Sequence, residues 1–170
     1  MNSGTITGPA ELQRRIPQLQ QGARNKYMAN VKRSAIVAHT PADMFRLVAD
    51  VDSYPSFLPW VTDSAVHSDT GDVVEASIEF ARGPVKQSLT TRNEMEKDRA
   101  IEMSLVKGPF KALHGRWDFE AVGDDGCKIS LQISFDFSNK VVQGTFGTVF
   151  NQIANTLVDA FCRRANEVYK

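Results

Sequence analysis

Residues 127–170 read CKISLQISFDFSNKVVQGTFGTVFNQIANTLVDAFCRRANEVYK, and the spacing of their apolar side chains changes at Asn139. From Cys127 to Ser138, apolar and polar residues alternate, as in a strand with one dry face and one wet face. After Asn139 the spacing predicts a helix of roughly 25–30 residues. Its apolar positions recur every three or four residues, at Phe146, Val149, Phe150, Ile153, Leu157, Phe161, Ala165 and Val168.

Strand-like runs separated by turn signals precede this segment. Turn residues stand at 70–72, 83–84, 97–99, 108–109 and 123–126. The runs between them predict strands over 61–69, 73–82, 85–96, 100–107 and 110–122. Because the connections are short, successive strands should pair antiparallel.

The first patterned residues predict another strand, over 30–39, and a short helix, over 40–51. Thr40 is the expected N-cap of this helix, and Pro41 suits its first turn. This order of elements is typical of an α+β fold with one antiparallel sheet of about seven strands.

The width of such a sheet predicts its shape. Seven strands about 4.8 Å apart span roughly 30 Å, whereas one helix covers only about 10–12 Å. A flat sheet would leave a large apolar face exposed, so we expect the sheet to curl around the C-terminal helix. Large side chains or a ligand must then fill the space between them. Gly144 and Gly147 either keep space beside a slim helix start or mark a frayed start.

The segment SYPSFLPWV, residues 53–61, combines bulky apolar side chains with two prolines. Pro55 and Pro59 disfavour regular structure, so we expect an irregular loop over one end of the sheet. Its aromatic side chains either plug the mouth of the internal space or face a bilayer interface, where Tyr and Trp are favoured.

Composition excludes several classes of protein. The chain has 170 residues and a net charge of zero, and no apolar run is long enough to cross a membrane. No secretion signal is evident, so we expect a cytoplasmic protein, with the surface of the inner membrane as the alternative location. Residues 1–27 carry four basic residues and one acidic residue, which leaves the remainder mildly acidic. A dedicated DNA-binding role is therefore not expected.

The N-terminal residues differ in character from the rest of the chain. Residues 1–28 are rich in Gln, Arg, Gly and small polar residues and lack a lasting apolar face. They predict a disordered tail, followed by one domain over residues 29–170. Cys127 and Cys162 follow no metal-binding spacing and are predicted to be buried free thiols.

Four motifs in order resemble the coenzyme Q-binding family, within the START-like, polyketide-cyclase-like group of helix-grip proteins. They are YPSFLPWV (54–61), TTRN (90–93), GPFKALHGRWDF (108–119) and FGTVFNQIANTLVDAFCRRANEVY (146–169). The resemblance covers roughly residues 29–170 and is strongest to the bacterial branch of ribosome association toxins. It implies a helix-grip fold with a deep apolar tunnel, and so a START-like lipid-binding domain.

The resemblance implies two functions of different classes. The first is non-catalytic binding of a polyprenyl lipid, ubiquinone above all, as a carrier or chaperone that supports respiratory electron transfer. The second is that of a toxin of a type II toxin–antitoxin system, which binds the large ribosomal subunit and blocks association of the subunits. For the second function, exposed positive charge would have to meet RNA phosphates, as at Lys107, Lys111, Arg116, Arg163 and Arg164.

For the lipid hypothesis we expect a dry tunnel and one or two hydrogen-bond donors. Apolar residues of the loop, the strands and the last helix are the candidate ligand-binding residues, each with ordinary core packing as the alternative. They are Tyr54, Phe57, Leu58, Trp60, Phe80, Leu89, Met103, Leu105, Phe110, Trp117, Phe146, Phe150 and Ile153. If side chains fill the space completely, a structural module without a ligand is the third hypothesis.

Catalytic motifs, phosphate loops and metal-ligand spacings were not found, so the protein is not expected to be an enzyme or to need a cofactor. A cyclase or aromatase is the enzymatic alternative, because related folds include cyclases. It would need a polar pair inside the cavity. The candidates are Arg92, Asn93, His114 and Arg116, whose alternative role is that of polar residues on the sheet surface.

Overall fold

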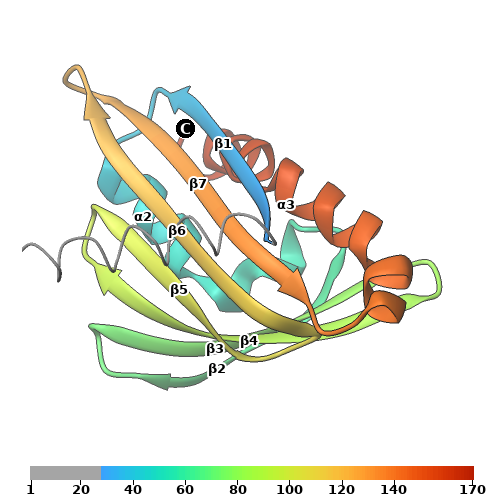
Figure 1. The fold of residues 1–170 in the computed structure, drawn as a ribbon. Helices are drawn as coiled ribbons and strands as arrows, with labels where there is room; N and C mark the ends of the chain where they lie inside the picture. Colours follow the sequence, from blue (N-terminus) through green and yellow to red (C-terminus); the bar gives the residue numbers. More distant parts are fainter. Residues whose placement is uncertain (1–27) are drawn as a thin grey trace, which may run out of the picture.

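The structure is a computed structural model and describes residues 28–170, so the predicted tail lies outside the described residues except for Met28. Two α-helices, one 3-10 helix and seven strands make up this part of the chain (Figure 1). In chain order they are β1 (Ala29–Val37), α2 (Pro41–Ala49), η1 (Val51–Ser56), β2 (Val61–Asp69), β3 (Val73–Arg82), β4 (Val85–Glu96), β5 (Ala100–Lys107), β6 (Phe110–Val122), β7 (Gly126–Phe137) and α3 (Lys140–Val168).

All seven strands form one antiparallel sheet in the order β1-β7-β6-β5-β4-β3-β2. The sheet curves around α3, with α2 and η1 near one end (Figure 1). Register shifts interrupt the pairing of β2 with β3, of β4 with β5 and of β6 with β7, and such bulges bend a sheet. The predicted α+β helix-grip fold is confirmed.

The N-terminal half of α3 packs on a group of phenylalanine rings. The ring centroid of Phe150 lies 4.8 Å from that of Phe135 and 4.9 Å from that of Phe110. Phe137 stacks on Phe110 at 5.3 Å, and Phe146 lies 5.5 Å from Phe150. At this end of the grip, large side chains therefore fill the space between helix and sheet.

The space that the glycines of α3 were predicted to keep is not found beside them. The helix starts at Lys140, where the Val142 N–H donates to the N-cap Asn139 Oδ1 at 2.9 Å, and fraying of this capped start stays a prediction. Gly147 faces the Phe137 ring, 3.4 Å from where a Cβ would stand, while Gly144 faces open space outside the core. Neither glycine lines a cavity described below.

The segment after β1 differs slightly from its prediction. The Asp43 N–H donates to Thr40 Oγ1 at 3.1 Å, which confirms the predicted cap of α2, although the helix ends at Ala49. The segment SYPSFLPWV is not wholly irregular, because its first residues belong to the 3-10 helix η1, which contains Pro55. Short 3-10 turns tolerate a residue without an N–H, since few of their donors are bonded within the turn.

Candidate functional site

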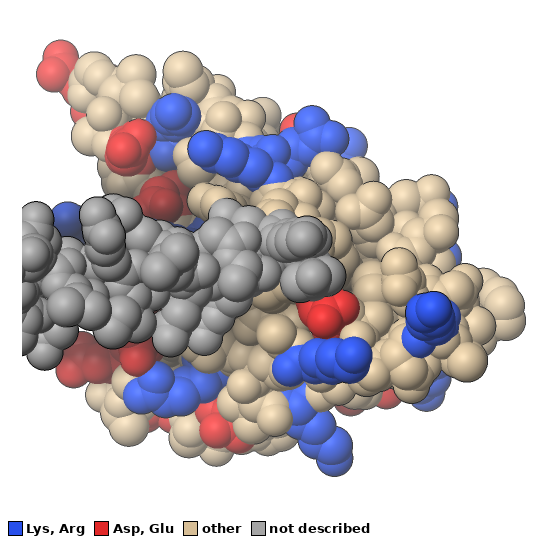
Figure 2. Space-filling model, in the orientation of Figure 1, with Lys and Arg blue, Asp and Glu red and all other residues tan. Residues whose placement is uncertain are grey.

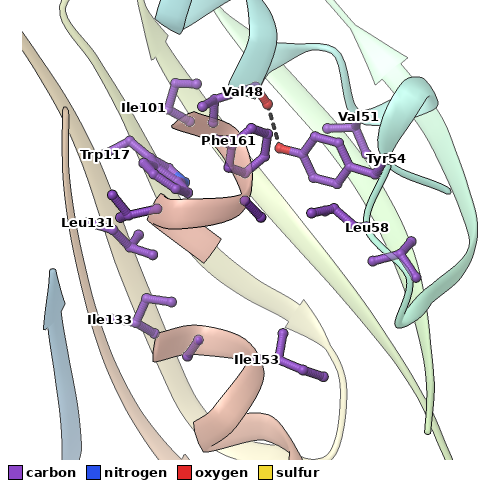
Figure 3. Packing of buried hydrophobic residues seen from close by; sticks show 14 of the residues in the cluster. Val48, Val51, Tyr54, Leu58, Ile101, Trp117, Leu131, Ile133, Ile153 and Phe161 are labelled. Atoms are coloured by element: carbon purple, nitrogen blue, oxygen red, sulfur yellow. Dashed lines mark hydrogen bonds between the residues drawn. The ribbon is translucent and has the colours of Figure 1, made fainter. Parts of the chain in front are cut away.

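An apolar cavity of about 80 Å³ lies between the sheet, the middle of α3 and the segment 53–61, which we call the lid. Figure 3 shows several of these side chains converging on the space between α3 and the strands. Nine predicted ligand-binding residues line the cavity: Tyr54, Leu58, Trp60, Phe80, Leu89, Met103, Trp117, Phe150 and Ile153. The structure therefore brings most of the predicted residues to one place.

Four predicted residues do not line this cavity. Phe110 and Phe146 belong to the phenylalanine group at the start of α3. Leu105 is half-buried against the core, and Phe57 packs on the outer side of the lid. Their apolar character reflects core packing rather than a position on the cavity wall.

Eight cavity residues were missed by the sequence analysis: Val61, Ile78, Thr91, Leu113, Ile133, Ala154, Leu157 and Phe161. For most of them, the spacing of apolar residues in the sequence could have predicted an inward position. Ile78 and Phe80 alternate on β3, Leu89 and Thr91 alternate on β4, and Ile133 lies on the dry face of β7. Ala154, Leu157 and Phe161 continue the helical spacing of Phe150 and Ile153.

Two side chains of the lid, Tyr54 and Leu58, point inward in this structure. Leu58 is 1% exposed and Tyr54 is 8% exposed. The Tyr54 hydroxyl donates to the Val48 carbonyl at 2.5 Å (Figure 3), and burial, helped by the charge of Asp50, raises the pKa of Tyr54 well above its usual range. Thus the lid plugs one side of the cavity, and contact of these side chains with a bilayer stays a prediction that would require the lid to open.

Phe57 links the lid to the C-terminal half of α3. Its ring centroid lies 6.0 Å from that of Tyr54 and 5.4 Å from that of Phe161. The guanidinium of Arg164 lies 5.1 Å from the Phe57 ring centroid, and Arg164 also pairs with Glu167 at 3.3 Å. This outer contact holds Phe57 in place without bringing it to the cavity.

Two kinds of polar group lie near the apolar wall. Thr91 and Asn93 are the buried polar side chains of residues 28–170, and the Thr91 hydroxyl donates to Asn93 Oδ1 at 2.8 Å. The Trp60 Nε1–H is buried and has no hydrogen-bond partner in the described part of the chain. A buried donor without a partner is uncommon and calls for an explanation.

The polar residues suggested for a cyclase do not gather in the cavity. Arg92 and His114 are exposed, and Arg116 pairs with Asp118 at 3.0 Å and with Glu102 at 3.3 Å on the outer face of the sheet. His114 pairs with the same Glu102 at 2.9 Å. The predicted alternative role as surface polar residues is confirmed for Arg92, His114 and Arg116, whereas it is wrong for Asn93, which is buried and faces inward.

The size of the cavity limits what it holds in this conformation. An apolar cavity of about 150 Å³ accommodates one benzene molecule, and drug-sized ligands occupy about 300–1,000 Å³. At about 80 Å³ this space is a small cavity rather than the open tunnel that the resemblance implied. A polyprenyl lipid would enter only if the lid or wall residues moved.

The cysteines, possible metal ligands and long helices of the described residues can be considered together. Cys127 and Cys162 are free thiols, Cys127 buried and Cys162 half-buried, and burial raises the pKa of both. No cluster of His, Cys, Asp or Glu within residues 28–170 has the arrangement of a metal site. Among the same residues, no helix is long and apolar enough to span a membrane.

The basic residues suggested for RNA contact fall into two groups. Arg116 and Arg164 are engaged by carboxylates, whereas Lys107, Lys111 and Arg163 are exposed and make no salt bridge with another described residue. On the face shown in Figure 2, Lys and Arg side chains are interspersed with Asp and Glu. The parts of that face left visible beside the grey residues carry no broad basic patch.

Comparisons with known proteins place the chain among relatives of two kinds. The sequence pattern of the family described as "Polyketide cyclase / dehydrase and lipid transport" matches residues 37–162. The ribosome association toxin RatA of Pseudomonas aeruginosa is 43% identical over 140 residues, which cover 82% of this chain and 97% of that protein. The mitochondrial coenzyme Q-binding protein COQ10 of Drosophila melanogaster is 24% identical over 130 residues, which cover 74% of this chain and 54% of that protein.

A solved structure supports the fold independently. The Zhui aromatase/cyclase from Streptomyces sp. R1128 superimposes with a TM-score of 0.76, covering 85% of this chain and 97% of that one. Its sequence identity of 13% means that the likeness concerns the fold alone.

Proposed function

The chain belongs to the polyketide cyclase / dehydrase and lipid transport family, and within that family we propose that it acts at the ribosome, as a toxin that binds the large subunit and blocks association of the subunits. The observation that carries this proposal is the 43% identity to a ribosome association toxin over 97% of that protein's length. The relatives reported above are named as a toxin and a binding protein, which supports a non-catalytic role. The proposal places the protein in the cytoplasm.

Lys107 and Lys111 are the residues we propose for contact with ribosomal RNA. They flank the turn between β5 and β6, and the Ser138 N–H donates to the Pro109 carbonyl of that turn at 3.1 Å. The turn therefore lies beside the start of α3, where the helix dipole adds positive potential. Exposed ammonium groups near a helix N-terminus suit RNA phosphates.

Sucrose-gradient profiles of bacterial cells that overproduce the protein test this proposal. We expect a fall in joined ribosomes and a rise in free subunits. Lys107→Glu together with Lys111→Glu should weaken the effect, because each replaces attraction to phosphate by repulsion. Lys97→Glu, in the exposed turn between β4 and β5 at the other end of these strands, is the matched control and should retain it. An unchanged profile with the unaltered protein would refute the proposal.

The cavity favours a second function, the binding of an apolar ligand such as ubiquinone. The specific observation is the unpartnered Trp60 Nε1–H, which belongs to a residue of the cavity wall. A ligand carbonyl oxygen would satisfy this donor, and the surrounding apolar side chains would accept the body of the ligand. One relative named for coenzyme Q binding and the family's description as including lipid transport support this proposal.

Lipid extraction from protein purified without detergent tests the second function. We expect a quinone or similar lipid to co-purify, and added ubiquinone to bind. Trp60→Phe keeps an aromatic ring but removes the N–H, so it should weaken quinone binding several-fold while retaining purely apolar ligands. Protein that carries no lipid and binds no added quinone would exclude this function without affecting the ribosomal one.

A further inference from the structure

A second, smaller cavity adjoins the first. It has a volume of about 20 Å³ and lies between the sheet, η1 and the end of α2. Tyr54, Met103 and Trp117 line both cavities and so form the wall between them. Tyr54 is fixed by its hydrogen bond to Val48, and Trp117 by aromatic contact with Phe161 at 5.4 Å. Met103 is the part of the wall that is free to change rotamer, because its side chain is unbranched and flexible.

Met103 rests over a glycine on the neighbouring strand. Asn93 on β4, Met103 on β5 and Gly115 on β6 lie directly opposite one another, so all three positions face the interior. A Cβ at Gly115 would stand 2.4 Å from the methyl carbon of Met103, a distance that real contacts do not reach. The side chain of Met103 therefore leans toward β6, into space that only glycine provides, and away from Asn93.

This position of Met103 leaves the Asn93 amide facing the smaller cavity. Asn93 is 7% exposed and accepts from Thr91 through Oδ1, while its Nδ2 group donates no hydrogen bond to another residue between 28 and 170. Thr91 lines the larger cavity and Asn93 the smaller one, so β4 contributes one polar side chain to each cavity. Unlike Trp60 Nε1, this donor is not sealed off by the surrounding side chains, so an oxygen atom of a molecule in the smaller cavity can accept from it.

We propose that the two cavities are compartments of one ligand chamber, that Met103 is the movable partition between them, and that Asn93 Nδ2 donates to an oxygen acceptor of the ligand. This inference rests on the second proposed function, binding of an apolar ligand. The ligand is uncharged, because no Asp, Glu, Lys, Arg or His lines either cavity and a buried charge would lack a counterion. Its chemical class is thus a mainly apolar molecule that carries a carbonyl oxygen.

Two small probes that share one skeleton test the proposal: tetralin, a hydrocarbon, and 1-tetralone, which adds one carbonyl oxygen. Both probes exceed the larger cavity and also the roughly 100 Å³ of the two cavities together, so binding requires Met103 and other wall or lid side chains to move. By calorimetry on the full chain, we expect 1-tetralone to bind roughly two- to tenfold more tightly than tetralin, the range of one hydrogen bond. Asn93→Leu should abolish this preference while tetralin still binds, whereas Trp60→Phe, which removes the other unpartnered donor of the wall, should keep the preference. A retained preference in Asn93→Leu would overturn the assignment of Asn93.

The partition is tested separately. Met103→Ala should tighten binding of both probes, and Gly115→Ala should weaken both, because the new Cβ forces Met103 into the chamber. Leu105→Ala, on the same strand but lining neither cavity, is the matched control and should leave both affinities within about twofold. Near-UV circular dichroism confirms that each variant is folded. Equal effects of Met103→Ala and Leu105→Ala would overturn the partition.

Failure of the underlying function gives a different result. If neither the unaltered protein nor Met103→Ala binds either probe, apolar ligand binding itself is excluded. If both bind and the preference for the ketone is absent, only the role of Asn93 is excluded.

Discussion

Replacing Tyr54 with phenylalanine removes one buried hydroxyl and keeps the ring that packs on Phe161. The hydroxyl donates to the Val48 carbonyl at 2.5 Å, and that carbonyl belongs to the last turn of α2, where no helical N–H is available. Net loss of a hydrogen bond costs about 0.5–1.5 kcal/mol, and leaving a buried acceptor unpaired adds to it. We therefore expect Tyr54→Phe to lower the free energy of unfolding by about 1–2 kcal/mol at neutral pH.

The same substitution should change the dependence of stability on pH. In the folded protein the pKa of Tyr54 is raised above its ordinary value of 10.0, so the unfolded chain ionises first as the pH rises. The contribution of Tyr54 is complete below pH 10.0 and is lost as the pH climbs toward the folded pKa. Each pH unit in this range costs about 1.4 kcal/mol, so the advantage over Tyr54→Phe should vanish roughly one unit above the unfolded pKa.

Urea unfolding followed by tryptophan fluorescence, from about pH 7 to about pH 11, measures both effects. Other titrating groups are common to the two chains and cancel in the difference. Tyr169→Phe is a control for the loss of a hydroxyl, since the Tyr169 hydroxyl donates to the Asp43 carbonyl at 3.1 Å but is only half-buried; it should cost less. The unaltered protein and Tyr54→Phe should differ less in free energy of unfolding as the pH rises, because Tyr54 ionises first in the unfolded chain. A difference that stays constant up to about pH 11 would refute this expectation.

Three further predictions concern stability. Asn139→Ala removes the cap of α3 and should cost about 1 kcal/mol in urea unfolding; an unchanged midpoint would mean that the cap is dispensable. Phe161→Ala should cost about 3–5 kcal/mol, since Tyr54, Phe57 and Trp117 each lie 5.4 Å from its ring; a loss below that of Asn139→Ala would contradict this packing. Burial raises the pKa of Cys127 from 9.0 to about 11, so its contribution is full below pH 9.0 and lost through about 11. Cys127→Ala should make the free energy of unfolding depend less steeply on pH between 9.0 and about 11. An unchanged dependence on pH would contradict this contribution of Cys127.

The strands were predictable because two signals agreed. Alternation of apolar and polar residues and short turns rich in Gly, Pro and Asp predicted β2 to β6 with their observed limits, and the change of period at Asn139 predicted α3. The curl of the sheet followed from the mismatch in width between seven strands and one helix. Each of these inferences uses local pattern or simple geometry.

The site was less predictable because a cavity forms where apolar side chains do not pack against one another, and the sequence does not show where that occurs. Phe110 and Phe150 look alike in sequence, yet only Phe150 borders the cavity, since the phenylalanine group closes around Phe110. Asn93 lies in a strand of alternating character, and its inward direction is fixed by its pairing with Met103. Glycine is needed at position 115 because the Met103 side chain of the neighbouring strand occupies the space of a Cβ. No spacing within the sequence predicts that contact.

The first strand of the described domain pairs with the last. β1 is held along its length by β7, from Ala29 opposite Phe135 to Val37 opposite Cys127. During synthesis, β1 therefore stays unpaired until β7 has been made, and α3, which fills the grip, follows β7. Because such distant pairing slows folding, the fold is expected to close only after both β7 and α3 have been synthesised. A prematurely terminated product should lack both the closing strand and the central helix, and so be a substrate for chaperones or proteases rather than a smaller working protein.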